Sequence, residues 1–137
     1  MKKKSLQGYT FTRNINGLAI PTNIQSQIIR NYCEMNDYNF KLHLDEFCLK
    51  NSYVQLFQIL KNKKNINSIG MCSIYFLPEN KNLMKKIFTI CKKRKLKIIF
   101  IFENIKFKNQ NINKFINEIK QIKKINFLTK KLKKNLF

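Results

Sequence analysis

The feature that most constrains the fold is a regular alternation of strand-like and helix-like segments. Short stretches rich in β-branched and aromatic residues are each followed by apolar residues at helical spacing. The strand-like stretches lie at 6–12, 39–44, 69–73 and 96–104, and the helix-like stretches begin near Pro21, Ser52, Leu77 and Ile112. Strands that alternate with helices of this length favour a parallel sheet with right-handed crossovers and helices on both faces.

We therefore expect a three-layer α/β fold with about four parallel strands in the flavodoxin-like order 2-1-3-4. All 137 residues should form a single domain, with a core at about 6–122 and a basic tail at about 126–137. The tail keeps apolar residues among its lysines, including Phe127, Leu128, Leu132 and Leu136. It could therefore extend the last helix, dock on a partner, fray, or touch a membrane surface.

Two of the expected helices carry local start signals. Pro21 suits the first helical position, where its missing N–H costs nothing. Ser52 and Gln55 have the spacing of a capping box, in which the two side chains satisfy free backbone N–H groups. We therefore expect Ser52 to cap the second helix.

The chain carries a formal net charge of +21, from 28 basic and seven acidic residues. Such a charge favours nucleic acid or an anionic membrane as a partner. However, 25 of the 28 are lysine, whose codons are AT-rich, so genome composition alone could load a solvated surface with it. Proteins that read bases rely on the bidentate fork of arginine, which occurs three times. We therefore expect non-specific polyanion binding and no specific nucleic-acid partner.

Cysteine and histidine usage argues against a metal site or a disulfide framework. The chain has one histidine, His43, and four widely spaced cysteines without a CxxC pair: Cys33, Cys48, Cys72 and Cys91. We expect reduced thiols, no metal, no cofactor and a cytoplasmic location. No hydrophobic segment follows the first lysines, and the longest strongly apolar run, 98–102, is too short to span a bilayer.

Candidate functional residues follow from the rule that an open parallel sheet places its crevice beyond the carboxyl ends of the strands. Polar residues occur at each expected strand end, among them His43, Asp45 and Glu46 after the second strand. We expect a catalytic role for Glu103 and ligand binding by Thr12, Arg13, Asn14, Ser73 and Asn104.

Glu103 and Arg13 are the strongest of these candidates. Glu103 follows five apolar residues and is one of only seven acids, so it could act as a general acid or base, or hold Arg13. The alternative is a strand-end acid that caps the next turn or pairs with a lysine. Arg13 begins a loop (13–20) that is long for its type and suits a phosphate or carboxylate, or it is simply a surface arginine.

Residues 8–33 resemble the opening of the sporadic carbohydrate cluster proteins, a family of small bacterial proteins. The matching positions are Gly8-Tyr9, Thr12-Arg13, Gly17, Pro21, Gln25, Ile29-Arg30 and Tyr32-Cys33, and the similarity continues through 73–80 and 98–105. The resemblance implies a role in lipopolysaccharide or capsule synthesis but no established reaction. We therefore expect an anionic sugar or sugar phosphate as ligand, or a partner protein such as a glycosyltransferase, with homo-oligomers as a further option.

The same N-terminal region also resembles the catalytic domain of serine recombinases. The shared features are a strand ending in Gly8-Tyr9, a polar loop, and a helix containing Gln25. In that family an arginine lies two positions after the tyrosine and the nucleophilic serine four positions after it. Phe11 and Arg13 occupy these positions here, so the resemblance implies a resolvase-like fold without the nucleophile. A nucleic-acid-binding module is therefore the alternative hypothesis.

Overall fold

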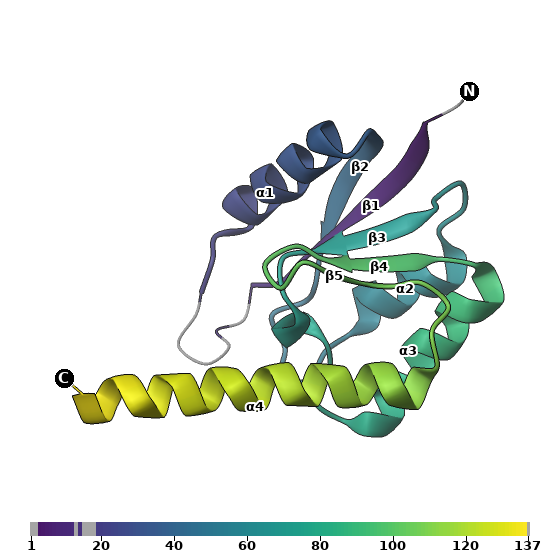
Figure 1. Ribbon diagram of the computed structural model, residues 1–137. Helices are drawn as coiled ribbons and strands as arrows, with labels where there is room; N and C mark the ends of the chain where they lie inside the picture. The colour runs from purple at the N-terminus through teal and green to yellow at the C-terminus, as the bar shows by residue number, and fades with distance from the viewer. Residues whose placement is uncertain (1–2, 13, 15–18, 137) are drawn as a thin grey trace.

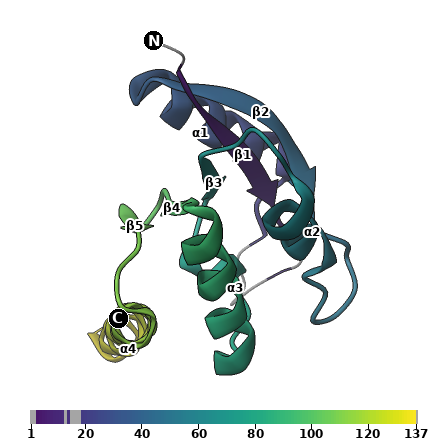
Figure 2. The same cartoon turned by 90° about the vertical axis from the view of Figure 1, so that its right-hand side faces the viewer.

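A five-stranded sheet forms the centre of the protein, and helices lie on both of its faces (Figures 1 and 2). The structure is a computed structural model that describes residues 3–12, 14 and 19–136. The strands are β1 (Lys4–Thr10), β2 (Tyr38–Asp45), β3 (Ser68–Met71), β4 (Lys97–Phe100) and β5 (Ile105–Phe107). The helices are α1 (Thr22–Met35), α2 (Val54–Asn62), α3 (Lys81–Arg94) and α4 (Ile112–Leu136), and a 3₁₀ turn, η1, covers Ile74–Phe76.

The strand order is β2-β1-β3-β4-β5. The first four strands are parallel, which confirms the predicted α/β class and the order 2-1-3-4. The fifth strand was not predicted, because the apolar stretch 96–104 reads as one strand. Instead the chain turns at 101–104, where Asn104 has a left-handed φ of 55°, and returns as β5 antiparallel to β4. Asparagine tolerates this conformation better than most residues.

Four phenylalanines fix which face of the sheet the last two helices cover. Phe88 of α3 lies 4.5 Å from Phe107 of β5, measured between ring centroids. Phe115 of α4 lies 5.2 Å from Phe107 and 6.3 Å from Phe100 of β4. Helix α1 packs on the other face, against β1, β2 and β3. Because strand side chains alternate, Lys97 and Ile99 of β4 point to the α1 face.

Close packing between β1 and β3 explains one glycine. A Cβ atom at Gly70 would lie 2.7 Å from Cδ2 of the buried Leu6 on the neighbouring strand. Such an approach is shorter than real carbon contacts allow, so any larger residue would push Leu6 out of the core.

The basic tail continues the last helix, which settles one of the alternatives left by the sequence. Figure 1 shows α4 running past the sheet to the C-terminus. Its second half exposes apolar side chains, with 60% of Ile125, 66% of Phe127 and 62% of Leu132 accessible. Within the described residues, no helix is both long and apolar enough to cross a membrane.

Candidate functional site

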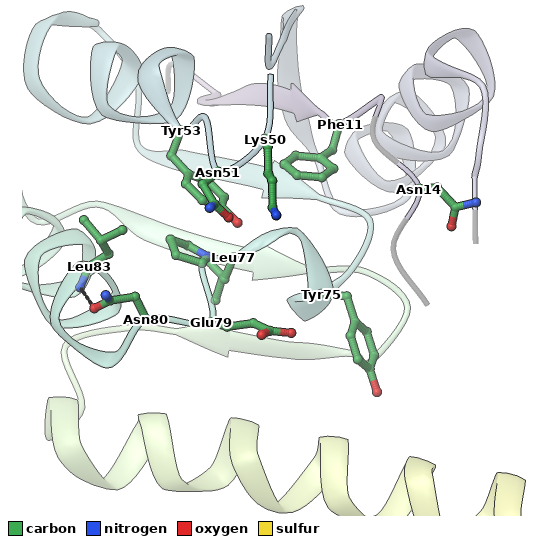
Figure 3. A pocket seen from close by; sticks show the side chains of 11 residues that line it. Phe11, Asn14, Lys50, Asn51, Tyr53, Tyr75, Leu77, Glu79, Asn80 and Leu83 are labelled. Carbon is green, nitrogen blue, oxygen red and sulfur yellow. Dashed lines mark hydrogen bonds between the residues drawn. The ribbon is translucent and has the colours of Figure 1, made fainter. Parts of the chain in front are cut away.

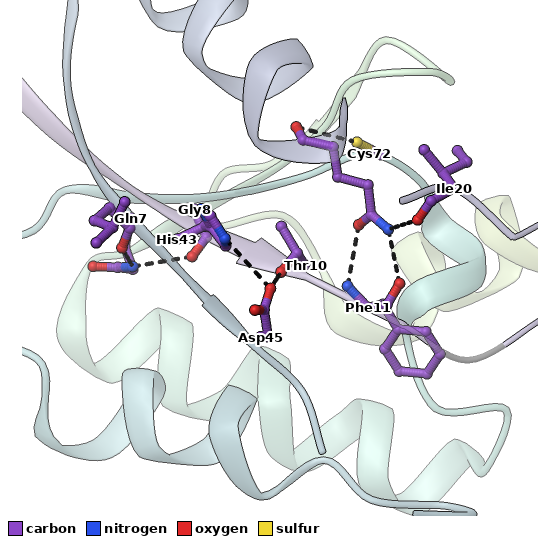
Figure 4. Close-up of polar contacts among 10 residues, drawn as sticks. Gln7, Gly8, Thr10, Phe11, Ile20, His43, Asp45 and Cys72 are labelled. Atoms are coloured by element: carbon purple, nitrogen blue, oxygen red, sulfur yellow. Dashed lines mark hydrogen bonds and ion pairs between the residues drawn. The ribbon is translucent and has the colours of Figure 1, made fainter. Parts of the chain in front are cut away.

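A buried glutamine holds both ends of the loop between β1 and α1. Gln25, in the first turns of α1, is fully buried. Its Oε1 accepts from the backbone N–H of Phe11 (3.1 Å), and its Nε2 donates to the carbonyls of Phe11 (2.7 Å) and Ile20 (2.8 Å) (Figure 4). The amide thereby satisfies backbone groups that leave the sheet at the carboxyl end of β1. Helix α1 begins after Pro21, which is the N-cap and not the first helical residue as predicted.

The carboxyl ends of β1 and β2 are joined by a second polar contact. The hydroxyl of Thr10 donates to Asp45 Oδ1, and His43 Nε2 lies 3.5 Å from the same oxygen (Figure 4). Thr10 is fully buried, so its hydroxyl is not placed to attack a ligand. His43 is a partly buried residue of β2 itself.

A buried carboxylate organises the start of α2. Glu46, 3% exposed, accepts hydrogen bonds from Tyr9 Oη (3.0 Å) and Ser52 Oγ (3.1 Å). It also accepts from three backbone N–H groups, at Phe47 (3.0 Å), Gln55 (3.1 Å) and Leu56 (3.2 Å). A carboxylate that accepts several backbone N–H bonds at a helix start is well stabilised.

The predicted capping box at Ser52 is therefore wrong. Tyr53 occupies the N-cap position of α2 and makes no side-chain cap. Glu46, six residues before Ser52, supplies the acceptor that a capping serine would otherwise provide, and Ser52 donates its own hydroxyl to it. Local spacing cannot reveal this, because the capping residue comes from the preceding strand end.

Glu103 contacts the turn that follows β3. Its Oε1 accepts from the Ile74 N–H (2.7 Å) and its Oε2 from the Ser73 hydroxyl (2.9 Å). Ser73 Oγ in turn accepts from the Tyr75 N–H (3.2 Å) and caps η1. The carboxylate thus ties the turn after β4 to the start of η1. A catalytic role for Glu103 stays a prediction.

A cavity of about 560 Å³ opens beside this turn (Figure 3). Its wall is aromatic and apolar at Phe11, Tyr53, Tyr75 and Leu77, and its polar rim consists of Asn14, Lys50, Asn51, Glu79 and Asn80. Lys50 reaches in from the loop before α2, and Glu79 from the segment before α3. An apolar pocket with a few polar groups is the usual form of a small-molecule binding site or active site.

Helix α4 contacts the same cavity wall through Tyr75. Lys123 Nζ lies 5.3 Å from the centre of the Tyr75 ring, and Asn126 Nδ2 donates to Tyr75 Oη (3.3 Å). Burial lowers the pKa of Lys123, and the nearby carboxylates of Glu79 and Glu103 oppose part of that shift. The tail of the chain is therefore anchored to the wall of the cavity.

The structure brings together only some of the predicted site residues. Ser73 and Glu103 form a direct contact, and Asn14 lines the cavity. Thr12 and Asn104 are exposed and are not part of the cavity wall. Arg13 lies outside the described residues, as does Gly17.

The sequence reading missed the aromatic wall of the cavity. Tyr53 and Tyr75 come from segments far apart in the chain, and neither lies at a strand end. Phe11 is buried, at 3% exposed, and stacks on Phe76 at 5.2 Å between centroids. The cluster of aromatic residues in 53–57 and 75–76 is the one signal that could have indicated a shared surface.

Three of the four cysteines are buried free thiols, and the fourth is an exposed one. Burial raises the pKa of Cys72 to about 12, with a smaller contribution from Glu103, and raises that of Cys91 to about 12. Cys48 is exposed, and Cys33 is buried. Among the described residues, no group of three or more His, Cys, Asp or Glu side chains is arranged to hold a metal ion.

The fold is similar to that of two solved structures, an integrase catalytic domain and a site-specific recombinase. The N-terminal catalytic domain of TP901-1 integrase superposes with a TM-score of 0.60 and 17% identity, over 93% of this chain and 99% of that one. A resolvase family site-specific recombinase from Streptococcus pneumoniae gives a TM-score of 0.58 and 11% identity, over 94% and 95% of the two chains. No protein-family model and no curated protein matches the sequence. The resemblance to sporadic carbohydrate cluster proteins is therefore unsupported.

Proposed function

We propose that this chain is a nucleic-acid-binding module that does not cut its target. The similar structures are described as a catalytic domain of an integrase and a site-specific recombinase, and such proteins act on DNA. At 11–17% identity the likeness establishes the fold alone. It nevertheless favours the alternative hypothesis over a sugar ligand, and it weighs against the expectation that the chain has no specific nucleic-acid partner.

The observation that carries the proposal is the lack of compensation for the positive charge. Within the described residues, Lys3 with Asp37 (3.3 Å) is the one contact between a lysine and a carboxylate. The acids Asp45, Glu46 and Glu103 instead accept hydrogen bonds from neutral groups inside the fold. The formal charge of +21 is therefore presented largely unpaired to solvent, where it attracts phosphates and releases their counterions.

Phe11 supports the absence of strand cleavage. It occupies the position where serine recombinases have an arginine two residues after the tyrosine. Its ring is 3% exposed and stacked between Phe76 (5.2 Å) and Tyr53 (6.2 Å), so the site is filled by an apolar core residue. An apolar ring cannot neutralise a phosphate in a transition state.

Both arginines that the structure describes make contacts within the fold. Arg94 of α3 donates to carbonyls at the end of α2, including that of Ile59 at 3.2 Å. Arg30 of α1 lies over the ring of Phe40, 4.9 Å from its centre. Contacts to nucleic acid would therefore come mainly from lysines, which suit the phosphate backbone more than base edges.

A gel-shift assay combined with a plasmid-cleavage assay tests both halves of the proposal. The protein is incubated with a mixed-sequence DNA duplex and with supercoiled plasmid at about 0.15 M salt, near physiological conditions. We expect a retarded duplex, intact plasmid and no protein–DNA adduct that survives SDS. A lysine homopolymer of similar charge is the control for simple charge attraction.

Each half of the proposal can fail separately. A duplex that is not retarded, or is retarded no better than by the homopolymer, contradicts the binding function. Nicked plasmid together with an SDS-resistant adduct contradicts the absence of cleavage. Neither result depends on the other.

A further inference from the structure

Four lysines gather at the amino edge of the sheet, away from the cavity. They come from three strands and one strand end: Lys4 begins β1, Lys97 begins β4, Lys106 lies in β5, and Lys108 follows β5. The antiparallel direction of β5 produces this arrangement, because it brings the end of β5 beside the start of β4.

The strand register places all four on the face that carries α1. Ile99 pairs with Lys106 and Ile98 with Phe107, so Lys108 follows opposite Lys97. Cross-strand partners share a face, and residues two apart along a strand do as well. The aromatic rings of Phe100 and Phe107 face α3 and α4, which leaves the lysines on the opposite side. Helix α1 packs on that side against β1, β2 and β3.

The cluster is electrostatically strained. Lys97 is partly buried, and burial followed by repulsion from Lys4, Lys108 and Lys106 lowers its pKa. Within the described part of the chain, none of the four lysines has a carboxylate partner within ion-pair distance. Folding therefore holds like charges together without an ion-pair partner among the described residues.

A buried hydroxyl lies beside the lysines. Ser68 pairs with Lys97 in the sheet, and its side chain is fully buried on the same face. Its Oγ has no hydrogen-bond partner among the described residues. A buried polar group without a partner calls for an explanation, and a bound water or ion is one of the standard ones.

We infer that Lys4, Lys97, Lys106 and Lys108 form a binding site for the phosphate groups of a nucleic-acid backbone. The inference rests on the proposed function and adds the surface through which it operates. Phosphates would neutralise the four ammonium groups and thereby remove their mutual repulsion. The contacts would fix position on the backbone and carry no base specificity.

The surroundings favour nucleic acid over a lipid surface. Most exposed large apolar residues lie elsewhere, for example Phe102 in the turn after β4 and Ile125 in α4; the exception is Met35 at the end of α1, near the start of β2. Membrane-surface binding combines cationic side chains with apolar groups that enter the lipid. The described strand residues of this edge offer the cations without such anchors.

The test compares two triple variants with the same loss of charge. Lys97→Gln, Lys106→Gln and Lys108→Gln remove most of the cluster. Lys81→Gln, Lys86→Gln and Lys93→Gln remove three exposed lysines from α3, on the other face. Binding to a fluorescent mixed-sequence duplex is measured by anisotropy as a function of salt, and circular dichroism checks the fold.

We expect the cluster variant to bind roughly 100-fold more weakly than wild type at about 0.15 M salt, if each lysine neutralises one phosphate. The slope of log K against log salt should become less steep by about 2.7, and the α3 variant should change far less. The single variants Lys106→Gln and Lys108→Gln change exposed side chains and keep Lys97. Each should bind the duplex about 5-fold more weakly than wild type. They test the cluster even if the triple variant does not fold.

The failures are distinguishable. If wild type does not bind the duplex, the proposed function fails. If wild type binds but both triple variants weaken equally, or neither does, the cluster is not the site. Binding to anionic phospholipid vesicles that is lost in the cluster variant, with DNA binding unchanged, overturns the inference in favour of a membrane.

Discussion

The carboxylate of Glu46 should be among the most important single side chains for stability. Replacing it by alanine removes five acceptor contacts at once, from Tyr9, Phe47, Ser52, Gln55 and Leu56. The hydroxyl of Tyr9 and the N–H of Leu56 lie in the core, so water cannot easily take the place of the lost oxygens.

The size of the effect follows from the type of contact. Hydrogen bonds to a charged group contribute about 1.5–3 kcal/mol each, but contacts that share one carboxylate are not additive. Breaking a buried charged network usually costs about 3–5 kcal/mol. We expect Glu46→Ala to lose about that much of a total stability on the order of 5–15 kcal/mol for a domain.

Urea denaturation followed by circular dichroism measures this loss. Glu46→Gln keeps the volume but turns an NH₂ group toward two or more N–H or O–H donors, so it should also be clearly destabilising. Glu118→Ala, at an exposed position of α4, is the matched control and should change stability by less than about 0.5 kcal/mol. A Glu46→Ala variant within about 1 kcal/mol of wild type would refute the reasoning.

Three further predictions concern the turn after β4, the buried thiols and the tail. Glu103→Ala should lower the free energy of unfolding by about 1–2 kcal/mol. Glu103→Gln should lower it by less, because an amide oxygen can still accept from the Ile74 N–H. Equal losses for the two variants in urea denaturation would contradict this reasoning. Burial raises the pKa of Cys72 from 9.0 to about 12, so the neutral thiol stabilises the fold fully below pH 9.0 and loses this contribution as the pH rises toward 12. The difference in unfolding free energy between wild type and Cys72→Ala should therefore narrow between pH 9 and 12. A difference that widens over this range contradicts the prediction. Light scattering should show that the protein self-associates through the exposed apolar residues of α4. The double variant Leu128→Glu with Leu132→Glu should have a lower molar mass in solution than wild type. An equal molar mass for the two proteins would contradict this interface.

The sequence indicated the sheet well because hydrophobic period is a local signal. Pro21 marked the start of α1 to within one residue, and the first four strands lie where the β-rich stretches were. The short β5 was missed because only Glu103 and Asn104 separate it from the apolar residues before it, and a three-residue edge strand gives almost no periodic pattern.

The candidate site was less accessible from the sequence. The strand-end rule placed Glu103 and Ser73 at the same edge of the sheet but could not show that they bond to each other, and their functional roles stay predictions. Glu46 was noted only as a polar residue after a strand, since its partners in β1 and α2 depend on tertiary structure. The lysine cluster depends on the direction of β5, which the sequence did not reveal.

The most direct test of the central claim is the salt dependence of duplex binding by the wild-type protein. Log K falls linearly with log salt for any phosphate-binding surface, so the affinity that remains near physiological salt is informative. We predict a Kd of about 1–100 μM at about 0.15 M salt, the usual range for sequence-independent binding to phosphates. A Kd weaker than this range would show that the lysines only coat the surface, and would contradict a nucleic-acid-binding function.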